Sequence, residues 1–464
     1  MYTRSMFKKV IQIKALSLIC MCLNISIALA DHSEDHHVPL PFFVDSSNPL
    51  STLTIKGTST NVLQGYPSFY DPTHENNVNK GNIQGGTKTN LYLGMNLWEG
   101  AAVYANPEIM YGYNVGDNIG LVNLVNIATA RVESQSPYIR MQRLFLQQEI
   151  DLGGGKVENE PLSSRNIELE SLQNQLRGKT SSNYIRITLG KFGVGDIFDD
   201  NIYAHDPNVH FLNLAFNTLD SIDYAGDPWG LTYGAAIEWV KDWWAIRAGI
   251  FQGALPPPSF NFDPKPLNQY MAITEVAVNH DKFFGQPGSI KLIAYQDNGY
   301  INNIGDVNQF NYSPEYPIFV KNNIRRTKMG LGLNIQQQLY ENIGFFLRAG
   351  IDNNAFDFRD STKSISGGLV LDGKMWKRPL DEIGLGLSYS GLKRAYGITE
   401  SGVVGFMGDG SLNYAPEKHL ESYYRWNINK NFDLTFDYQL VKNPDYNKSR
   451  GNVHVFGLRL RANF

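Results

Sequence analysis

The sequence predicts an all-β protein, a transmembrane antiparallel β-barrel of about 16 strands, with 14 or 18 strands as the alternatives. Apolar and polar residues alternate along many short segments, and Gly, Asn, Asp or Pro bounds most of them. The chain holds 25 Tyr, 25 Phe, 7 Trp and 43 Gly. After residue 30, no apolar stretch approaches the roughly 18 residues that mark a membrane helix. Barrel strands need only about 9 to 11 residues to cross a bilayer.

The C-terminal segment shows the alternation best. Phe456, Leu458, Leu460, Ala462 and Phe464 share one face, and the intervening residues are glycine, arginine or asparagine. In a membrane barrel one face of each strand meets lipid and the other meets the lumen. A single strand of a soluble sandwich would show the same pattern, so only its repetition along the chain favours a barrel.

The pattern does repeat. It is clear at residues 244–250, 345–352 and 433–440, and further segments of similar length lie at 184–192, 270–280, 290–296, 329–340, 365–376 and 420–428. Counting candidate strands from Thr52 to Phe464 gives roughly 16, within the even-numbered range of single-chain barrels.

The connections alternate between short and long. Lys241-Asp242, Glu341-Asn342 and residues 429–431 are predicted hairpin turns, whereas 253–268 and 297–328 are long polar loops. Outer-membrane barrels have this arrangement, with short turns at one end and long loops at the other. Residues 163–177 could form a short amphipathic helix in a loop, and the glycine cluster at 153–155 is interpreted as a turn, because it lacks the spacing of a phosphate-binding loop.

Residues 1–30 are predicted to be a cleaved signal peptide, with a basic start, an apolar stretch and the cleavage site Ala28-Leu29-Ala30. We expect residues 31–50 to be disordered and residues 51–464 to form the barrel. Cys20 and Cys22 lie in the leader, so the mature chain would have no thiol nucleophile and no disulfide. Losing the four basic residues of the leader changes the net charge from −4 to −8, which disfavours binding to nucleic acid.

Several motifs resemble one known family. They include Gly190-Lys191-Phe192, Asp199-Asp200-Asn201, residues 203–207, 211–213 and 233–239, and, near the C-terminus, Gly408-Asp409-Gly410, Asn443-Pro444, Arg450-Gly451 and residues 455–460. Over about 92–464 the chain resembles the carbohydrate-selective porins of the OprB family. The resemblance implies a barrel in the cell outer membrane that passes small sugars by diffusion and has outer-membrane lipid as its surroundings. It also implies that the terminal Phe464 is the signal that the barrel-assembly machinery reads.

The face opposite the apolar side chains supplies the candidate lumen residues. An Arg or Lys on the lipid-facing side costs about 2 to 4 kcal/mol at the midplane, so these charges should point inward. Guanidinium groups, carboxylates and aromatic rings can all replace the water around a sugar. The candidates for lining the translocation path are Arg143, Arg186, Arg247, Phe346, Arg348, Glu421, Tyr423, Arg425, Arg459 and Arg461, with Glu149, Phe192, Asp352, Asp433 and Asp437 on the same inner face.

Two further clusters, one of aspartates and one of histidines, each have a structural and a functional interpretation. Asp196, Asp199, Asp200 and Asp206 form an acidic loop that could fold inward or bind a hard cation, with a solvated loop favoured. Three histidines, at 32, 36 and 37, could bind a transition metal, with a disordered terminus favoured. We therefore expect no metal site and no cofactor.

Two other functions remain open. A structural or adhesive barrel would have a plugged lumen and no conductance. An outer-membrane enzyme would need a nucleophile and a base within hydrogen-bond reach, and the histidines of this chain are scattered outside any catalytic motif.

Overall fold

The computed structural model describes residues 53–72, 80–112, 124–129, 137–153, 156–158, 174, 176, 179–181, 183–222, 224–227, 230–254, 262–283, 285–299, 325–353, 361–391 and 413–464. The predicted signal peptide, the disordered segment and the three N-terminal histidines lie outside these residues. The predicted helix at 163–177 also falls outside them, except for residues 174 and 176.

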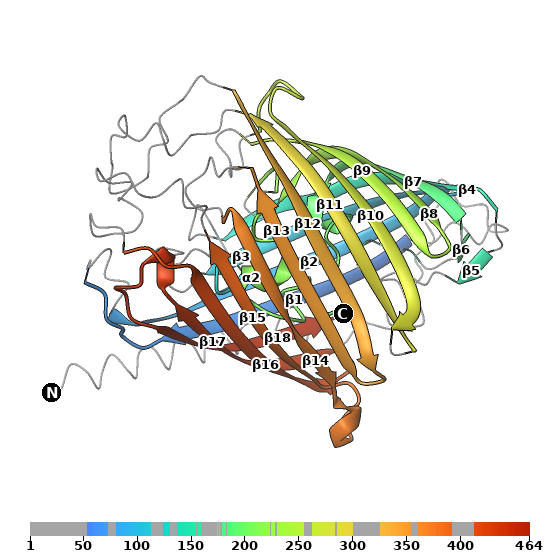
Figure 1. Cartoon of the computed structure of the whole chain (residues 1–464). Helices are drawn as coiled ribbons and strands as arrows, with labels where there is room; N and C mark the ends of the chain where they lie inside the picture. Colours follow the sequence, from blue (N-terminus) through green and yellow to red (C-terminus); the bar gives the residue numbers. More distant parts are fainter. Residues whose placement is uncertain are drawn as a thin grey trace.

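The described chain forms a closed barrel of sixteen antiparallel strands (Figure 1). The strands, in the order of the chain, are β1 (Leu53–Tyr66), β2 (Asn82–Trp98), β3 (Ala101–Gly112), β4 (Tyr138–Asp151), β7 (Asn183–Gly193), β8 (Leu231–Lys241), β9 (Trp244–Gln252), β10 (Tyr270–Phe283), β11 (Gln286–Gly299), β12 (Arg326–Tyr340), β13 (Ile343–Asp352), β14 (Lys363–Asp372), β15 (Glu382–Gly391), β16 (Glu417–Asn429), β17 (Phe432–Lys442) and β18 (Val453–Asn463). Each strand pairs with its neighbours in the chain, and β1 pairs with β18 to close the sheet. The predicted fold class and strand number are confirmed.

The side chains follow the predicted inside and outside faces. On β18, Phe456 is 57% exposed and Leu458 41%, whereas Arg459 between the outward positions is 1% exposed. Ile351 on β13 is 58% exposed, whereas Arg348 is 1% exposed. On these two strands the apolar side chains therefore form the outer wall and the arginines face the interior. No helix among the described residues is long and apolar enough to span a bilayer.

The turns predicted to be short are short. The strands β8 and β9 are joined at Asp242, whose φ of 49° gives the left-handed backbone of a tight turn, and Glu341-Asn342 joins β12 to β13. The turn between β16 and β17 also lies where it was predicted. A separate two-stranded sheet of β5 (Lys156–Glu158) and β6 (Lys179–Ser181) lies in the connection from β4 to β7.

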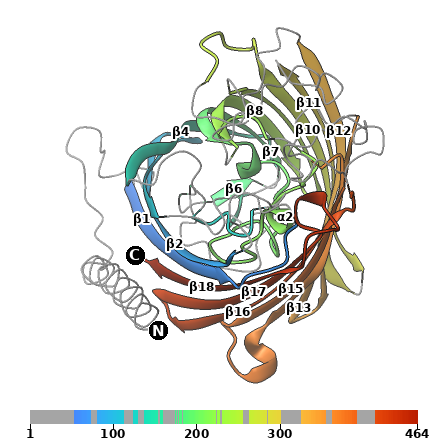
Figure 2. The same ribbon diagram turned by 90° about the vertical axis from the view of Figure 1, so that its left-hand side faces the viewer.

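The connection between β7 and β8 runs into the barrel (Figure 2). It contains the 3-10 helix η3 (Val194–Asp196) and the short helix α2 (Leu214–Asn217), and we call residues 194–230 the inner loop. Residues 124–129 lie beside it, because the N–H of Ile127 donates to the carbonyl of Leu212 at 2.9 Å. The inner loop occupies part of the lumen and brings a polar backbone against the barrel wall.

The buried core lies between the inner loop and the wall. Tyr104 stacks on Phe145 with ring centroids 5.0 Å apart, and Phe192 and Phe251 continue the contact at 5.3 Å. Phe198 of the inner loop packs against Phe251 at 6.0 Å. Aromatic side chains on the inner face therefore bury themselves under the loop and hold it against strands β3 to β9.

Candidate functional site

A row of alternating charges crosses five neighbouring strands on the inner face. The register places the five residues directly opposite one another, from β4 to β10. They are Glu149, Arg186, Glu238, Arg247 and Glu275, and we call them the charged row. Their positions in the sheet give each arginine a carboxylate on both sides.

The contacts within the charged row are short. Arg186 Nη2 lies 2.8 Å from Glu149 Oε2, and its Nη1 lies 3.9 Å from Glu238. Arg247 contacts Glu238 at 2.9 Å through Nε and Glu275 at 2.5 Å through Nη1. Three carboxylates and two guanidiniums give the row a net charge of −1. The side chains of Arg186 and Glu149 are 26% and 22% exposed, so this end of the row is accessible from the lumen.

Arg143 connects the wall to the start of the inner loop. A bulge in β4 lets it point inward beside Gln142, and its Nε and Nη2 each donate to the carboxylate of Asp196 at 2.6 Å. Asp196 in turn accepts from the N–H of Gly193 at 2.7 Å. Both charged side chains stay partly exposed, at 18% and 28%.

Asp199 binds the inner loop to the barrel wall through both its carboxylate and its backbone. The carboxylate accepts from Arg348 Nε at 2.9 Å, from Asn334 Nδ2 at 2.6 Å and from the N–H of Leu219 at 2.7 Å. The N–H of Asp199 donates to Glu275 Oε2 at 2.9 Å. Asp199 is 1% exposed, so the favoured interpretation of a solvated acidic loop is wrong at this residue.

Two other predicted lumen residues hold the middle of the inner loop. Arg459 donates to the carbonyls of Pro207, Val209 and His210 at 2.6 to 2.7 Å. Glu421, which is fully buried, accepts from the N–H groups of Leu212 and Asn213 at 2.5 and 3.0 Å. A buried polar side chain that satisfies backbone groups fixes the path of a loop.

Phe346 and Tyr423 face inward as predicted but lie beneath the inner loop. Their rings lie 5.3 and 5.0 Å from the ring of Phe211, and they are 0% and 2% exposed. The hydroxyl of Tyr423 donates to Glu382 at 2.6 Å. These two rings support the loop rather than meeting the solvent of the lumen.

Arg425 and Arg461 keep partial contact with the lumen. Arg425 lies 3.3 Å from Glu382 and is 19% exposed, and Arg461 lies 4.0 Å from Asp433 and is 17% exposed. The predicted arginines thus divide into two groups. Five are partly exposed and paired with carboxylates, namely Arg143, Arg186, Arg247, Arg425 and Arg461, whereas Arg348 and Arg459 are buried against the inner loop.

Sequence reasoning missed Glu238 and Glu275. Both lie on the inner face, and Glu238 sits between the outward-facing Ile237 and Trp239, which are 46% and 43% exposed. That alternation was a usable signal for Glu238. The role of Glu275 depends on its contact with Asp199, 76 residues away in the chain, which no local pattern indicates.

The inner loop also carries perturbed groups. Burial lowers the pKa of His210 to about 4. Burial on its own raises the pKa of Asp206, but the Arg461 guanidinium and the Asn208 N–H outweigh it, so this pKa lies below its ordinary value. Asp206 is therefore a carboxylate at neutral pH. Within the described ranges, no three His, Cys, Asp or Glu side chains gather into a metal site.

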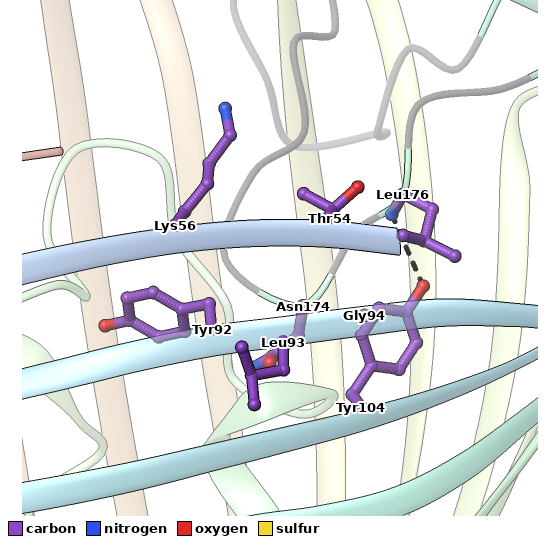
Figure 3. A pocket seen from close by; sticks show the side chains of 8 residues that line it. All are labelled: Thr54, Lys56, Tyr92, Leu93, Gly94, Tyr104, Asn174 and Leu176. Carbon is purple, nitrogen blue, oxygen red and sulfur yellow. Dashed lines mark hydrogen bonds between the residues drawn. The ribbon is translucent and has the colours of Figure 1, made fainter. Parts of the chain in front are cut away.

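A small cavity lies inside the wall between β1, β2 and β3 (Figure 3). Tyr92 and Tyr104 line it, and the hydroxyl of Tyr104 accepts from the N–H of Leu176 at 3.4 Å. Its volume is about 10 Å³, which holds about one water molecule. A sugar would not fit there.

Comparison with known proteins gives the family and the fold. A family profile described as carbohydrate-selective porin, OprB family, matches residues 74–464. The high-pH structure of Pseudomonas putida OprB aligns with a TM-score of 0.63 and 16% identity, over 89% of this chain and 94% of that one. The outer-membrane channel DcaP of Acinetobacter baumannii aligns over 89% and 97% with 9% identity and a TM-score of 0.47. Salmonella typhi OmpF with daunomycin aligns over 89% and 98% with 11% identity and a TM-score of 0.48.

No curated protein sequence matches the chain. The family profile nevertheless covers most of its length, and the OprB structure shares the fold. The protein is a passive channel for carbohydrates in the outer membrane. The chain belongs to the OprB family of carbohydrate-selective porins.

Proposed function

We propose that small sugars cross the barrel past the charged row, over its lumen-accessible end at Glu149 and Arg186. The observation that carries this proposal is the unbroken alternation of carboxylate and guanidinium over five strands. Strands lie about 4.8 Å apart, so acceptors and donors alternate at a spacing close to the width of a sugar ring. Sugar hydroxyls both donate and accept, and they can exchange partners from one strand to the next.

Weak binding follows from the pairing inside the row. Each guanidinium already contacts a carboxylate, so a sugar hydroxyl competes for bonds that are partly satisfied. Transport needs contacts strong enough for entry and weak enough for release. We assign the same lining role to Arg143, Arg425 and Arg461, whose side chains are partly exposed.

The other predicted lumen residues have a different role in this proposal. Arg348, Arg459 and Glu421 fix the inner loop, and Phe346 and Tyr423 support it from below. They would set the width of the path without touching the solute.

Sugar block of the ionic current tests the proposal. A sugar in the path displaces ions, so planar-bilayer currents should fall in steps as glucose or another neutral monosaccharide is added. In the double variant Arg186→Gln and Arg247→Gln, the sugar concentration that halves the current should rise about tenfold, since each lost hydrogen bond is worth about 0.5 to 1.5 kcal/mol. A matched variant, Lys418→Gln with Lys442→Gln, removes two positive charges from the outer wall and should leave the block unchanged.

Two outcomes would contradict the proposal in different ways. Absence of conductance would favour a structural barrel. Conductance that sugars block equally in wild type and in the arginine variant would keep the channel and remove the charged row as its sugar path.

We propose no catalytic role for this chain. In the described part, His419 bonds Glu417 at 2.7 Å and Asn213 at 3.0 Å beneath the inner loop, where both ring nitrogens are already engaged. A hydrolase assay with lipid and peptide ester substrates should give no turnover above the buffer rate.

We also propose that residues 1–30 are removed on export, that the barrel domain begins near residue 51, and that the assembly machinery recognises the C-terminal Phe464. Support for the last point is the pairing of β1 with β18 that closes the barrel, which we call the seam. Phe464 exchanges two backbone hydrogen bonds with Gly57 of β1, at 2.6 and 3.0 Å.

A further inference from the structure

Two lysines lie directly opposite each other on the outer face of the barrel. Lys418 of β16 and Lys442 of β17 are partners in the register, and both are exposed. Their strand neighbours Glu417, His419 and Val441 are buried, so the lysines share the outward face with Trp426 and Phe436, which are 39% and 47% exposed.

Such a pair is unfavourable on its own. Directly opposed side chains on one face have Cβ atoms about 4.5 to 5.5 Å apart, and like charges there destabilise a sheet. Within the described residues, neither lysine reaches a carboxylate at ion-pair distance. The described residues therefore supply no counter-charge to this pair.

A third lysine extends the positive surface. Lys363 is the first residue of β14, and it too is exposed. A Cβ atom built on Gly391 would lie 3.1 Å from Lys363 Cε and 3.1 Å from Tyr389 Cε1, so the lysine stem runs beside the Tyr389 ring. All three lysines lie at the strand ends that meet the long connections, which in outer-membrane barrels is the extracellular rim.

An apolar groove continues from these lysines along the outer wall. The register links Lys442, Lys418 and Tyr389 to the groove residues Ile365 and Ala349 in one cross-strand row. The groove has a volume of about 410 Å³ and is lined by Leu292, Leu331, Leu333, Ala349, Ile351, Lys363, Ile365 and Tyr389, with adjoining residues.

The row leads from the rim into the depth of the membrane. Lys442 ends β17, whereas Leu292 lies in the middle of β11, because the strands of a barrel are tilted. From Lys418 to Ala349 the row crosses three strand spacings, about 14 Å. That length is close to half of the roughly 30 Å hydrocarbon core, so it matches one acyl chain of one leaflet.

We propose that this surface binds a lipid with a phosphate-bearing head group in the extracellular leaflet. The phosphate lies between Lys418 and Lys442, with Lys363 at its side, and one acyl chain lies in the groove over Ala349. Charge complementarity selects the head group, and the groove continues the lipid-facing wall already described. Tyr389 lies between the two parts, at the depth where aromatic side chains favour the membrane interface.

Native mass spectrometry of the purified barrel in neutral detergent tests this assignment. The probe is diphosphoryl lipid A, compared with the same lipid without phosphates. Wild type should retain the diphosphoryl lipid, and Lys418→Gln with Lys442→Gln should weaken retention about 25-fold, since each lysine near a membrane surface contributes about fivefold. The matched double variant Lys374→Gln with Lys377→Gln removes two exposed lysines of the turn between β14 and β15 and should retain the lipid as wild type does.

Thermal unfolding separates binding from damage to the fold. Without lipid, the Lys418 and Lys442 variant should be at least as stable as wild type, because the repulsion is gone. With diphosphoryl lipid A, wild type should gain stability and the variant should gain little. Inorganic phosphate at millimolar concentration should not displace the lipid, because it has no chain for the groove.

Ala349→Phe fills the groove from the outside and should weaken lipid retention without lowering stability. Equal retention of lipid A with and without phosphates, or equal retention by wild type and the Lys418 and Lys442 variant, would overturn the proposal. A change of oligomeric mass in Ala349→Phe, with lipid retention unchanged, would overturn it in favour of contact with a second copy of the chain.

Discussion

Arg348 Nε lies 2.9 Å from Asp199 Oδ1, and each side chain is only 1% exposed. The same guanidinium donates to the carbonyls of Ala204 and Phe216 at 2.6 and 2.8 Å. One inward arginine of β13 therefore ties together both halves of the inner loop. In the proposed path, the width available to the sugar would therefore depend on a residue that the solute does not touch.

Asp199→Asn should loosen the inner loop. It leaves Arg348 buried without a counter-charge, which costs about 3 to 5 kcal/mol when one partner of a buried pair is lost. Single-channel conductance should rise and become noisier. On heating, the inner loop of the variant should detach from the wall at a lower temperature than in wild type, while the barrel is still folded. The control is Asp200→Asn, because the Asp200 side chain is 33% exposed and lies 3.9 Å from Lys291. Equal conductance in wild type and Asp199→Asn would rule out this role.

Ion selectivity should follow the charge of the row. Arg186→Gln with Arg247→Gln changes its net charge from −1 to −3 and should favour cations, whereas Glu149→Gln with Glu238→Gln changes it to +1 and should favour anions. Reversal potentials in a tenfold salt gradient measure both. Shifts in the same direction for the two variants would show that the row does not lie on the ion path.

Acidic pH should weaken the inner loop through His210. Burial lowers the pKa of His210 to about 4, so the folded protein holds this ring neutral while the unfolded chain, with a pKa near 6.5, takes up a proton. Stability from this group is present above pH 6.5 and is lost as the pH falls towards 4, by up to about 3 kcal/mol. His210→Gln should flatten the dependence of urea unfolding on pH between 6.5 and 4. If the pH dependence of urea unfolding had the same slope in His210→Gln as in wild type, this role of His210 would be contradicted.

The inside and outside faces can be tested on β18. Leu460→Arg should destabilise the barrel by about 2 to 4 kcal/mol if it lies near the midplane, because it places a charge in lipid. Arg461→Leu should leave the barrel folded, since Arg461 is 17% exposed to the lumen and lies 4.0 Å from Asp433. Urea unfolding in lipid vesicles compares them, and equal losses would mean that the two faces are assigned incorrectly.

The end of the chain can be tested from both sides of the seam. Deleting Phe464 should lower the yield of heat-modifiable barrel, and so should Gly57→Leu, because a Cβ at Gly57 would lie 2.1 Å from the Phe464 ring. Gly153→Leu is a matched control, since a Cβ there meets no atom within 4 Å, although its φ of 97° adds local strain. Full assembly without Phe464 would exclude it as the assembly signal.

The sequence was sufficient for the strands and their faces because a period of two needs only local residue types. Arg459 and Leu458 were assigned to opposite faces from their alternation alone, and their exposures of 1% and 41% agree. The sequence was insufficient for deciding which of the inward-facing residues are exposed to the solvent of the lumen. Arg348 and Arg247 carry the same local pattern, but Arg348 is covered by a loop whose anchor lies 149 residues away. Only the folded path of the inner loop distinguishes an arginine that is exposed to the lumen from one that is buried under the loop and holds it.

The pairing of β1 with β18, with Thr58 opposite Asn463, makes closure depend on both ends of the barrel domain. Every other wall contact joins strands that are neighbours in the chain order of the barrel, so it can form early, whereas the seam must await the last residues. A chain that stops short of β18 would keep two unpaired strand edges, which attract other chains. Only a chain that includes β18 can therefore close the barrel. Truncated copies should be degraded or aggregate before they can form a leaking pore in the membrane.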